Sequence, residues 1–212
     1  MQTDSVLAEA RIIPVVVINR ANRAQALAEA LVAGGIPFAE VTFRTDAAAA
    51  SIRAMAADPS LCVGAGTVVT PAQVDEAADA GARFIVSPGF SAAVVRRAQE
   101  HGLPFFPGAV TPTEIIAALD AGLSTLKFFP AGLYGGPAAL TALGAPFPQV
   151  RFIPTGGVSA ANLSEYLSLP NVAAVGGSWM VPADAVDAGD VPTITRLCAQ
   201  AVAALPTPAE VA

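Results

Sequence analysis

The regular alternation of short apolar segments with alanine-rich helical ones constrains the fold of this chain more than any other feature. The apolar segments have the length of β-strands, and apolar runs of this kind between glycine and proline residues are typical of strands. Eight are present, at residues 12–18, 38–43, 62–68, 83–87, 105–108, 125–129, 151–154 and 173–176. Because they are apolar throughout, they are typical of parallel strands that are buried on both faces.

Helical patterns fill the intervals between these strands. They are predicted at residues 23–33, 47–57, 71–80, 92–101, 112–121, 137–143, 160–167 and 183–204. In the last of them Gly189 and Pro192 predict a break, because both residues interrupt helices. The pairs Thr70–Pro71 and Thr111–Pro112 are typical of helix starts, where threonine caps the first amides and proline occupies the first turn.

Eight strands that are each followed by a helix predict an α/β fold, a (β/α)8 barrel with its helices outside. A doubly wound sheet is the alternative, although at this length it would usually contain about five or six strands. The length of 212 residues is near the lower limit for one such barrel and too short for two. We therefore expect residues 1–212 to form a single domain.

Composition and charge argue against several classes of partner. The longest apolar runs are well short of the roughly 20 residues that a membrane helix needs, so no membrane partner is expected. Asp4 and Glu9 stand where a secretory signal would carry basic residues. Cys62 and Cys198 lie far apart, which favours a reducing, cytoplasmic location. A net charge of −6 without a basic cluster beyond one arginine pair argues against binding of nucleic acid.

The chain contains ten arginines but a single lysine, Lys127. Such a composition suggests that arginine has replaced lysine wherever a plain positive charge is sufficient. An amine can lose its proton and attack a carbonyl, whereas a guanidinium cannot. Leu126 and Phe128 on either side of Lys127 predict a buried position, where an ammonium is costly and tends to lose its proton. We therefore expect Lys127 to form a Schiff base.

Glu40 lies in the middle of the predicted strand at residues 38–43. A carboxylate in a central barrel strand must be paired or neutral, because an isolated buried charge is too costly. One interpretation is an ion pair with Lys127 or Arg44 that serves the structure alone. The other is a general acid and base that is held near the imine-forming lysine. The two interpretations are compatible in the resting protein.

Further candidates follow from the ends of the strands, where the active sites of (β/α)8 barrels lie. Arg44 leaves the second strand and offers a rigid fork of donors for a substrate carboxylate. Thr67 can add a hydroxyl, and the preceding Gly64 and Gly66 are expected to let the ligand approach closely. The glycine-rich segments 155–157 and 176–178 end the last two strands, which is the recurrent phosphate site of this fold.

The single histidine, His101, lies at a predicted helix end without histidine or cysteine partners nearby. It is therefore interpreted as a surface or capping residue. Its isolation argues against metal catalysis and against Ser–His or Cys–His mechanisms, so neither a metal nor another cofactor is expected. Trp179 is interpreted as a core or interface residue.

Several segments, in order along nearly the whole chain, resemble the 2-keto-3-deoxy-6-phosphogluconate (KDPG) aldolases. These are residues 38–45 (FAEVTFRT), 63–69 (VGAGTVV), 84–89 (FIVSPG), 106–108 with Thr111 (FPG..T), 126–131 (LKFFPA), 154–158 (PTGGV) and 176–184 (GGSWMVPAD). The KFFPA and GGSW segments are highly specific. Many members of this family also act as 4-hydroxy-2-oxoglutarate aldolases.

The resemblance implies a class I, metal-free aldolase that binds a phosphorylated keto acid, yields pyruvate and glyceraldehyde 3-phosphate, and is usually a homotrimer. Lys127 corresponds to the Schiff-base lysine and Glu40 to the general acid and base. The other roles that it implies are carboxylate binding by Arg44 and Thr67, phosphate binding by Gly157, Gly177 and Ser178, and pocket lining by Thr155, Gly156, Pro88 and Phe129.

One position departs from some members of the family. Where these relatives carry an arginine at the end of the first strand, this chain has Val17, with Arg20 nearby. Arg44 is therefore expected to carry that role as well. Two alternatives remain open: an aldolase for the galactonate-derived epimer, and a catalytically silent phosphate-binding barrel. The second would lack Lys127 or Glu40, and this chain has both. A metal-dependent aldolase is disfavoured because metal ligands are missing.

Overall fold

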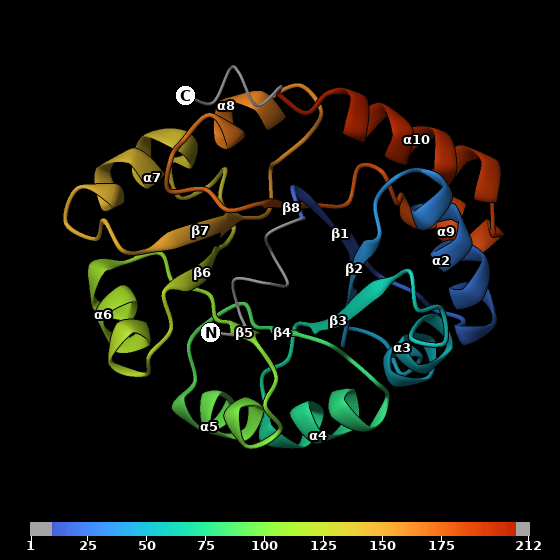
Figure 1. Ribbon diagram of the computed structural model, residues 1–212, viewed down its shortest axis with the longest axis horizontal. Coiled ribbons are helices and arrows are strands. Elements are labelled where there is room, and N and C mark those ends of the chain that lie inside the picture. The colour runs from blue at the N-terminus through green and yellow to red at the C-terminus, as the bar shows by residue number, and fades with distance from the viewer. Residues whose placement is uncertain (1–9, 207–212) are drawn as a thin grey trace.

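A computed structural model describes residues 10–206, so Asp4 and Glu9 lie outside the described part. Eight strands line the centre of this part and helices surround them (Figure 1). The strands are β1 (Ile12–Val16), β2 (Phe38–Thr42), β3 (Cys62–Gly66), β4 (Ile85–Val86), β5 (Phe105–Phe106), β6 (Thr125–Phe128), β7 (Arg151–Pro154) and β8 (Val175–Gly177). All eight agree in place with the strands that the sequence predicts.

The strands pair in parallel and close into a barrel. Six of them form one sheet in the order β5-β4-β3-β2-β1-β8, and β6 pairs with β7. Isolated bridges join the two sheets at both seams. Gly108 pairs with Lys127 between β5 and β6, and on the β7 side Phe152 pairs with Val172 and Thr155 with Gly176. The predicted (β/α)8 barrel is confirmed. A doubly wound sheet is wrong for this chain, because sequential strands are neighbours all the way round.

The helices occupy the predicted intervals and form the outer ring in Figure 1. Both predicted helix starts carry a complete capping box, in which Thr70 pairs with Gln73 and Thr111 with Glu114. The predicted break is confirmed at Gly189, which has a left-handed backbone with φ of 72°. The bounds are Ala21–Arg23 (η1), Ala24–Ala33 (α2), Ala48–Met55 (α3), Pro71–Asp79 (α4), Ala92–Glu100 (α5), Pro112–Asp120 (α6), Gly136–Gly144 (α7), Leu163–Leu167 (α8), Ala183–Ala188 (α9) and Val191–Ala203 (α10).

Several elements are shorter than the sequence predicts, and in three of them the cause is a nearby residue. Strand β5 contains two residues because Pro104 and Pro107 flank it, and proline has no amide to donate to a ladder. Strand β4 ends before Ser87, which Pro88 follows. Helix α8 begins at Leu163, not at residue 160, because the side chain of Asn162 accepts the Ser159 amide at 2.8 Å and holds a turn there.

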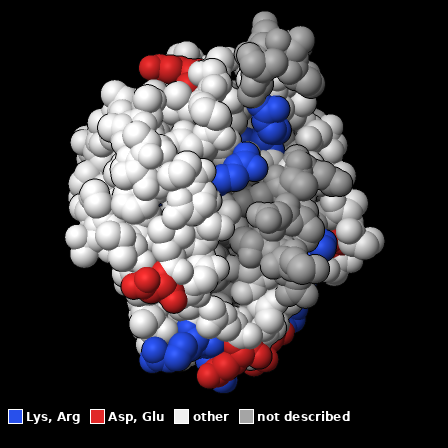
Figure 2. All heavy atoms as spheres, turned by 60° about the vertical axis from the view of Figure 1, so that its left-hand side comes forward, with Lys and Arg blue, Asp and Glu red and all other residues white. Residues whose placement is uncertain are grey.

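The described surface carries charges of both signs. On the face shown in Figure 2 the charged side chains lie in small separate groups of both signs. Within residues 10–206 no helix is long and apolar enough to cross a membrane. Both cysteines are buried, and burial raises the pKa of the Cys198 thiol to about 12. A thiol in such surroundings is a poor nucleophile.

Candidate active site

Lys127 and Glu40 meet inside the barrel. Nζ of Lys127 donates to Oε1 of Glu40 at 3.0 Å and to Oε2 at 3.3 Å. The lysine comes from β6 and the glutamate from β2, on opposite sides of the barrel (Figure 1). Each residue is only 3% exposed. Both sequence interpretations of Glu40 therefore lead to one geometry, a buried ion pair that joins the predicted nucleophile to the predicted acid and base.

This pair is chemically unusual within the described part of the chain. Lys127 and Glu40 are its only charged residues in the buried class; the other buried polar residues are threonines and serines. Taking two charges out of water is expensive, and mutual attraction repays the cost only with good geometry. Passing one proton from Nζ to the carboxylate leaves a neutral amine and a neutral acid. The pair is therefore suited to generating a nucleophile and a proton donor in one step.

Phe129 connects the lysine to the glycine-rich loop after β7. The ring centroid of Phe129 lies 5.5 Å from Nζ of Lys127, within the range of a cation–π contact. The ring also packs against Gly156, where a Cβ atom would lie 3.2 Å from two ring carbons. The structure thus brings Lys127, Phe129 and Gly156 together, as expected for residues that line one pocket.

Arg44 and Thr67 lie side by side at the ends of β2 and β3. Nε of Arg44 donates to Oγ1 of Thr67 at 3.1 Å. Thr67 has a positive φ of 57°, which is strained for a β-branched residue. Such strain persists only where the surroundings impose it, and it is concentrated at functional sites. Arg44 is exposed and Thr67 half-buried, and the pair lies where β2 and β3 end.

The two glycine-rich loops are neighbours, because Thr155 bridges to Gly176. Gly156 and Gly157 both have a left-handed backbone, with φ of 87° and 84°. Successive amides in such turns can point toward an anion. Gly177 is packed tightly by Trp179, whose ring a Cβ atom at Gly177 would meet at 1.9 Å, while Ser178 is exposed. The two loops that carry the predicted phosphate-binding residues are therefore adjacent, and phosphate binding there stays a prediction.

Asn162 holds the glycine-rich loop after β7 and is not among the site residues that the sequence predicts. Nδ2 of Asn162 donates to the carbonyl of Gly157 at 2.9 Å, and its Oδ1 accepts the amide of Ser159 at 2.8 Å. The asparagine just before a helix is the available signal, because such residues bond to nearby backbone groups. Trp179 is half-buried, and its Nε1 is a buried donor without a partner in the described structure.

The expected role of the glycines in β3 is wrong. A Cβ atom at Gly64 would lie 2.3 Å from the ring of Phe84, and one at Gly66 would lie 2.1 Å from Oε1 of Glu40. Protein side chains fill the space beside both glycines, so this space is not open for a ligand. The sequence indicates that small residues are needed there but not which neighbour needs the space.

Two remaining candidates lie at the edge of the site. Pro88 is exposed at the end of β4, and its carbonyl oxygen packs against Gly108, where a Cβ atom would lie 2.0 Å away. Arg20 donates to the backbone carbonyl of Asp187 in α9. Since this contact holds Arg20 on α9, the expectation that Arg44 and not Arg20 replaces the missing first-strand arginine agrees with the geometry.

His101 is a surface residue, as its sequence context predicts. Its Nε2 lies 2.7 Å from Oδ1 of Asp75, which also accepts from Arg97. The hydrogen bond from Arg97, followed by that from His101, lowers the pKa of the Asp75 carboxyl below its usual value. Among residues 10–206 there is no group of three or more histidine, cysteine or acidic side chains that could hold a metal.

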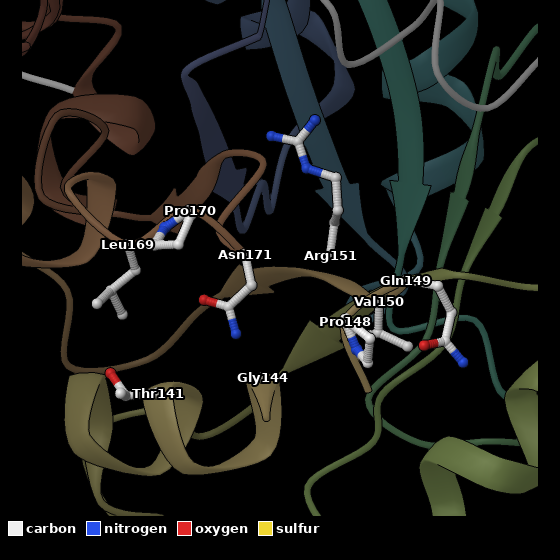
Figure 3. A pocket seen from close by; sticks show the side chains of 9 residues that line it. All are labelled: Thr141, Gly144, Pro148, Gln149, Val150, Arg151, Leu169, Pro170 and Asn171. Carbon is white, nitrogen blue, oxygen red and sulfur yellow. The ribbon is translucent and has the colours of Figure 1, made fainter. Parts of the chain in front are cut away.

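A groove of about 680 Å³ lies where the chain enters β7 and β8 (Figure 3). It is lined by the end of α7 and by the segments that lead into β7 and β8. The sticks for Gln149, Arg151 and Asn171 in Figure 3 point in different directions. Arg151 donates to the carbonyl of Val172, and Asn171 to that of Leu140. Without converging polar groups, this groove is a weaker candidate for catalysis than the buried pair.

Comparison with known proteins decides the family. The profile of the family described as "KDPG and KHG aldolase" matches residues 3–197. The chain belongs to this family. Membership makes the chain an aldolase, a carbon–carbon lyase, and agrees with the resemblance that its motifs show.

Individual relatives in the KDPG and KHG aldolase family are similar over nearly their full length. The KHG/KDPG aldolase of Escherichia coli (strain K12) is 47% identical over 200 residues, 94% of each chain. The KDPG aldolase of Zymomonas mobilis ZM4, solved with 3-phosphoglycerate, is 41% identical, with a TM-score of 0.91 and 97% of each chain covered. The KDPG aldolase of Legionella pneumophila is 44% identical, with a TM-score of 0.90 over 94% of this chain and 97% of that one. It was solved with pyruvate captured as a covalent carbinolamine intermediate.

Proposed function

We propose that this chain cleaves 2-dehydro-3-deoxy-6-phosphogluconate to pyruvate and glyceraldehyde 3-phosphate through a Schiff base on Lys127. The buried contact of 3.0 Å between Lys127 and Glu40 is the observation that carries the proposal. It gives an amine a proton acceptor within reach, which is what attack on a carbonyl requires. The covalent pyruvate intermediate of the Legionella pneumophila relative supports the same chemistry.

The first half of the reaction forms the imine. Glu40 takes a proton from Nζ of Lys127, and the free amine attacks the C2 carbonyl of the substrate to give a carbinolamine. Glu40 then returns a proton to the departing hydroxyl, and loss of water leaves a cationic iminium. Arg44 and Thr67 hold the carboxylate next to C2 during these steps. Their placement at the ends of β2 and β3 supports this role.

The second half breaks the C3–C4 bond. Glu40, directly or through a water, removes the proton of the C4 hydroxyl, and the electrons of the broken bond move onto the iminium to give an enamine and the aldehyde. Glu40 then donates a proton to C3, and hydrolysis releases pyruvate. The phosphate, held by Gly157, Gly177 and Ser178, anchors the far end of the substrate. Its binding energy positions C4 against Glu40.

The same site is proposed to accept 4-hydroxy-2-oxoglutarate, which would give pyruvate and glyoxylate. That substrate has no phosphate and would leave the glycine loops unused, so we expect weaker binding. The galactonate-derived epimer is the alternative phosphorylated substrate. Steady-state kinetics on both epimers distinguishes the two assignments, because a preference for the galactonate compound would overturn the proposed one.

We further propose that residues 1–212 act as one domain in the cytoplasm, within the Entner–Doudoroff pathway, and that the chain assembles as a homotrimer. The loop between β6 and α7 supports assembly, because Leu133 is 87% and Tyr134 53% exposed. Large apolar side chains exposed together often mark interfaces. The molar mass of the assembly in light scattering tests this part, and a monomeric mass would contradict it.

Borohydride reduction in the presence of pyruvate is expected to leave one stable adduct on the peptide that contains Lys127. The imine forms between Nζ and the pyruvate carbonyl, and hydride converts it to a secondary amine. Since the chain has one lysine, mass spectrometry of the intact protein and of its peptides locates the adduct directly. A parallel sample without pyruvate controls for unspecific modification. An unmodified Lys127 peptide at saturating pyruvate would refute the Schiff-base mechanism.

The variant Arg44→Lys is expected to raise KM for the phosphorylated substrate about tenfold to a hundredfold, the range for a lost hydrogen bond to a charged group. Lysine keeps the positive charge but loses the planar fork that binds a carboxylate with two donors. Steady-state kinetics measures the effect, and kcat should change less than KM because the carboxylate is bound before and during bond cleavage. Arg53→Lys, on the exposed side of α3, is the matched control. An unchanged KM in Arg44→Lys would remove Arg44 from the carboxylate site.

A further inference from the structure

Gly66 stands out among the buried glycines because of the residue that occupies its side-chain space. It is the last residue of β3 and pairs with Thr42 in the β2–β3 ladder. A Cβ atom there would lie 2.1 Å from Oε1, 2.5 Å from Cγ and 2.6 Å from Cδ of Glu40. All three of its nearest neighbours therefore belong to the carboxylate arm of a single residue, the one that contacts Lys127.

The backbone does not require a glycine at this position. Gly66 is not among the residues with a positive φ, and its carbonyl accepts the Phe43 amide at 2.8 Å in an ordinary ladder contact. Any L-residue can adopt such a conformation. The restriction at residue 66 is therefore one of volume alone, and the volume belongs to Glu40.

Neighbouring glycines show that this arrangement is specific to Gly66. The space beside Gly64, two residues earlier on the same strand, is filled by the ring of Phe84, and the space beside Gly176 by the side chain of Thr155. A ring is rigid and resists displacement, whereas a glutamate side chain can rotate away. A methyl group at residue 66 is therefore expected to displace the side chain of Glu40 without unfolding the barrel.

We propose that Gly66 is a positioning residue: its missing side chain leaves the space in which the carboxylate of Glu40 lies against Nζ of Lys127. This inference rests on the proposed function, because it acts only through the proton transfers assigned to Glu40. To regain ordinary contact, at about 3.4 Å in place of 2.1 Å, the carboxylate must move by more than 1 Å. A misplacement of about 1 Å in an active site can cost about a hundredfold in rate.

The test uses Gly66→Ala in the full chain and compares how much imine forms with how fast protons reach C3. The amount of adduct after prolonged reduction with borohydride and pyruvate reports the imine, while the rate at which the pyruvate C3 protons exchange with solvent deuterium reports one of the proton transfers assigned to Glu40. We expect Gly66→Ala to retain the Lys127 adduct and to lose about a hundredfold in C3 exchange and in kcat. Equal losses in trapping and exchange, or exchange at the wild-type rate, would overturn the inference.

Gly64→Ala is the matched control because it adds the same methyl group to the same strand against Phe84. It is expected to lower the Tm while the ratio of exchange to trapping, measured on the folded protein, stays at the wild-type value. If Gly64→Ala changes this ratio as much as Gly66→Ala does, any distortion of β3 suffices and the inference fails.

A second background shows whether Gly66 acts through Glu40. In Glu40→Gln the further change Gly66→Ala should alter the residual exchange by no more than about twofold, because the group it displaces no longer transfers protons. The same hundredfold loss in both backgrounds would overturn the inference. If Gly66→Ala does not fold, the double variant Glu40→Ala with Gly66→Ala is expected to fold, because it removes the side chain that the new methyl group would meet. If neither variant folds, Gly66 is a purely structural residue and the inference fails.

The proposed function can fail separately. A wild-type chain that gives neither adduct nor exchange overturns the Schiff-base proposal together with this inference. If the wild-type chain gives the adduct and the exchange, and Gly66→Ala gives both at the wild-type level, only the role of Gly66 is overturned.

Discussion

Replacing Lys127 with methionine is expected to lower kcat/KM for cleavage by at least about 10⁴-fold. Losses of this size are found when an enzyme loses a nucleophile that works together with a base. Methionine has similar length and suits apolar surroundings, but it cannot form an imine. The residual activity would come from substrate binding alone. A coupled assay for pyruvate release measures the loss, and the borohydride adduct should disappear with it.

The same variant removes one partner of a buried ion pair, so its fold needs a separate control. Leaving Glu40 alone in a site where it is 3% exposed is expected to cost roughly 3 kcal/mol of the free energy of unfolding. Lys127→Met combined with Glu40→Gln removes both charges and should recover part of that stability without recovering activity. Activity in Lys127→Met within tenfold of wild type would show that the reaction does not pass through this amine.

Replacing Glu40 with glutamine is expected to reduce kcat by about 10³-fold, within the range for loss of a general acid and base. Glutamine keeps the shape of the side chain and can still accept a hydrogen bond from Lys127, but it does not carry a proton between the substrate atoms. The Lys127 adduct should still form with pyruvate, more slowly, because the nucleophile remains. Steady-state cleavage and C3 proton exchange measure the deficit.

Two results would contradict this role for Glu40. A cleavage rate near the wild-type value would make the buried pair structural, which is the other interpretation that the sequence allows. Loss of the adduct at long reaction times would instead indicate that Glu40 is needed only to hold Lys127. The variant Glu29→Gln, in α2, is a suitable control for removal of a carboxylate elsewhere.

The sequence predicts the barrel well because its strands repeat a simple pattern. Apolar segments that alternate with helices determine the order and direction of the elements, and the threonine–proline pairs place two helix starts. The lengths of β4 and β5 are less predictable, because prolines decide where a ladder ends after neighbouring strands have already aligned. Lys127 and Glu40 are conspicuous for the same physical reason: a charge in an apolar strand needs an explanation.

The supporting contacts are hidden from the sequence because they depend on which neighbour fills a given volume. The sequence around Gly66 does not indicate that the side chain of Glu40, 26 residues earlier, occupies the space beside it. The turn held by Asn162 and the contact of Arg20 with Asp187 likewise join segments whose positions follow from the closed barrel. A sequence pattern predicts which residues of a helix or strand face the core, whereas these contacts can be identified only in the folded structure.

The closure of the barrel and the chemistry of its site depend on the same residue. Between β5 and β6 the ladder narrows to one bridge, and that bridge is Lys127 itself, whose amide donates to Pro107 and whose carbonyl accepts from Ala109. The other seam is joined by the bridges of Phe152 with Val172 and of Thr155 with Gly176. Lys127 therefore acts in two places: its backbone joins β5 to β6, and its side chain contacts Glu40 across the barrel. Opening the barrel beside β6 would move the amine away from the carboxylate, so the nucleophile and its base are paired only while the barrel is closed.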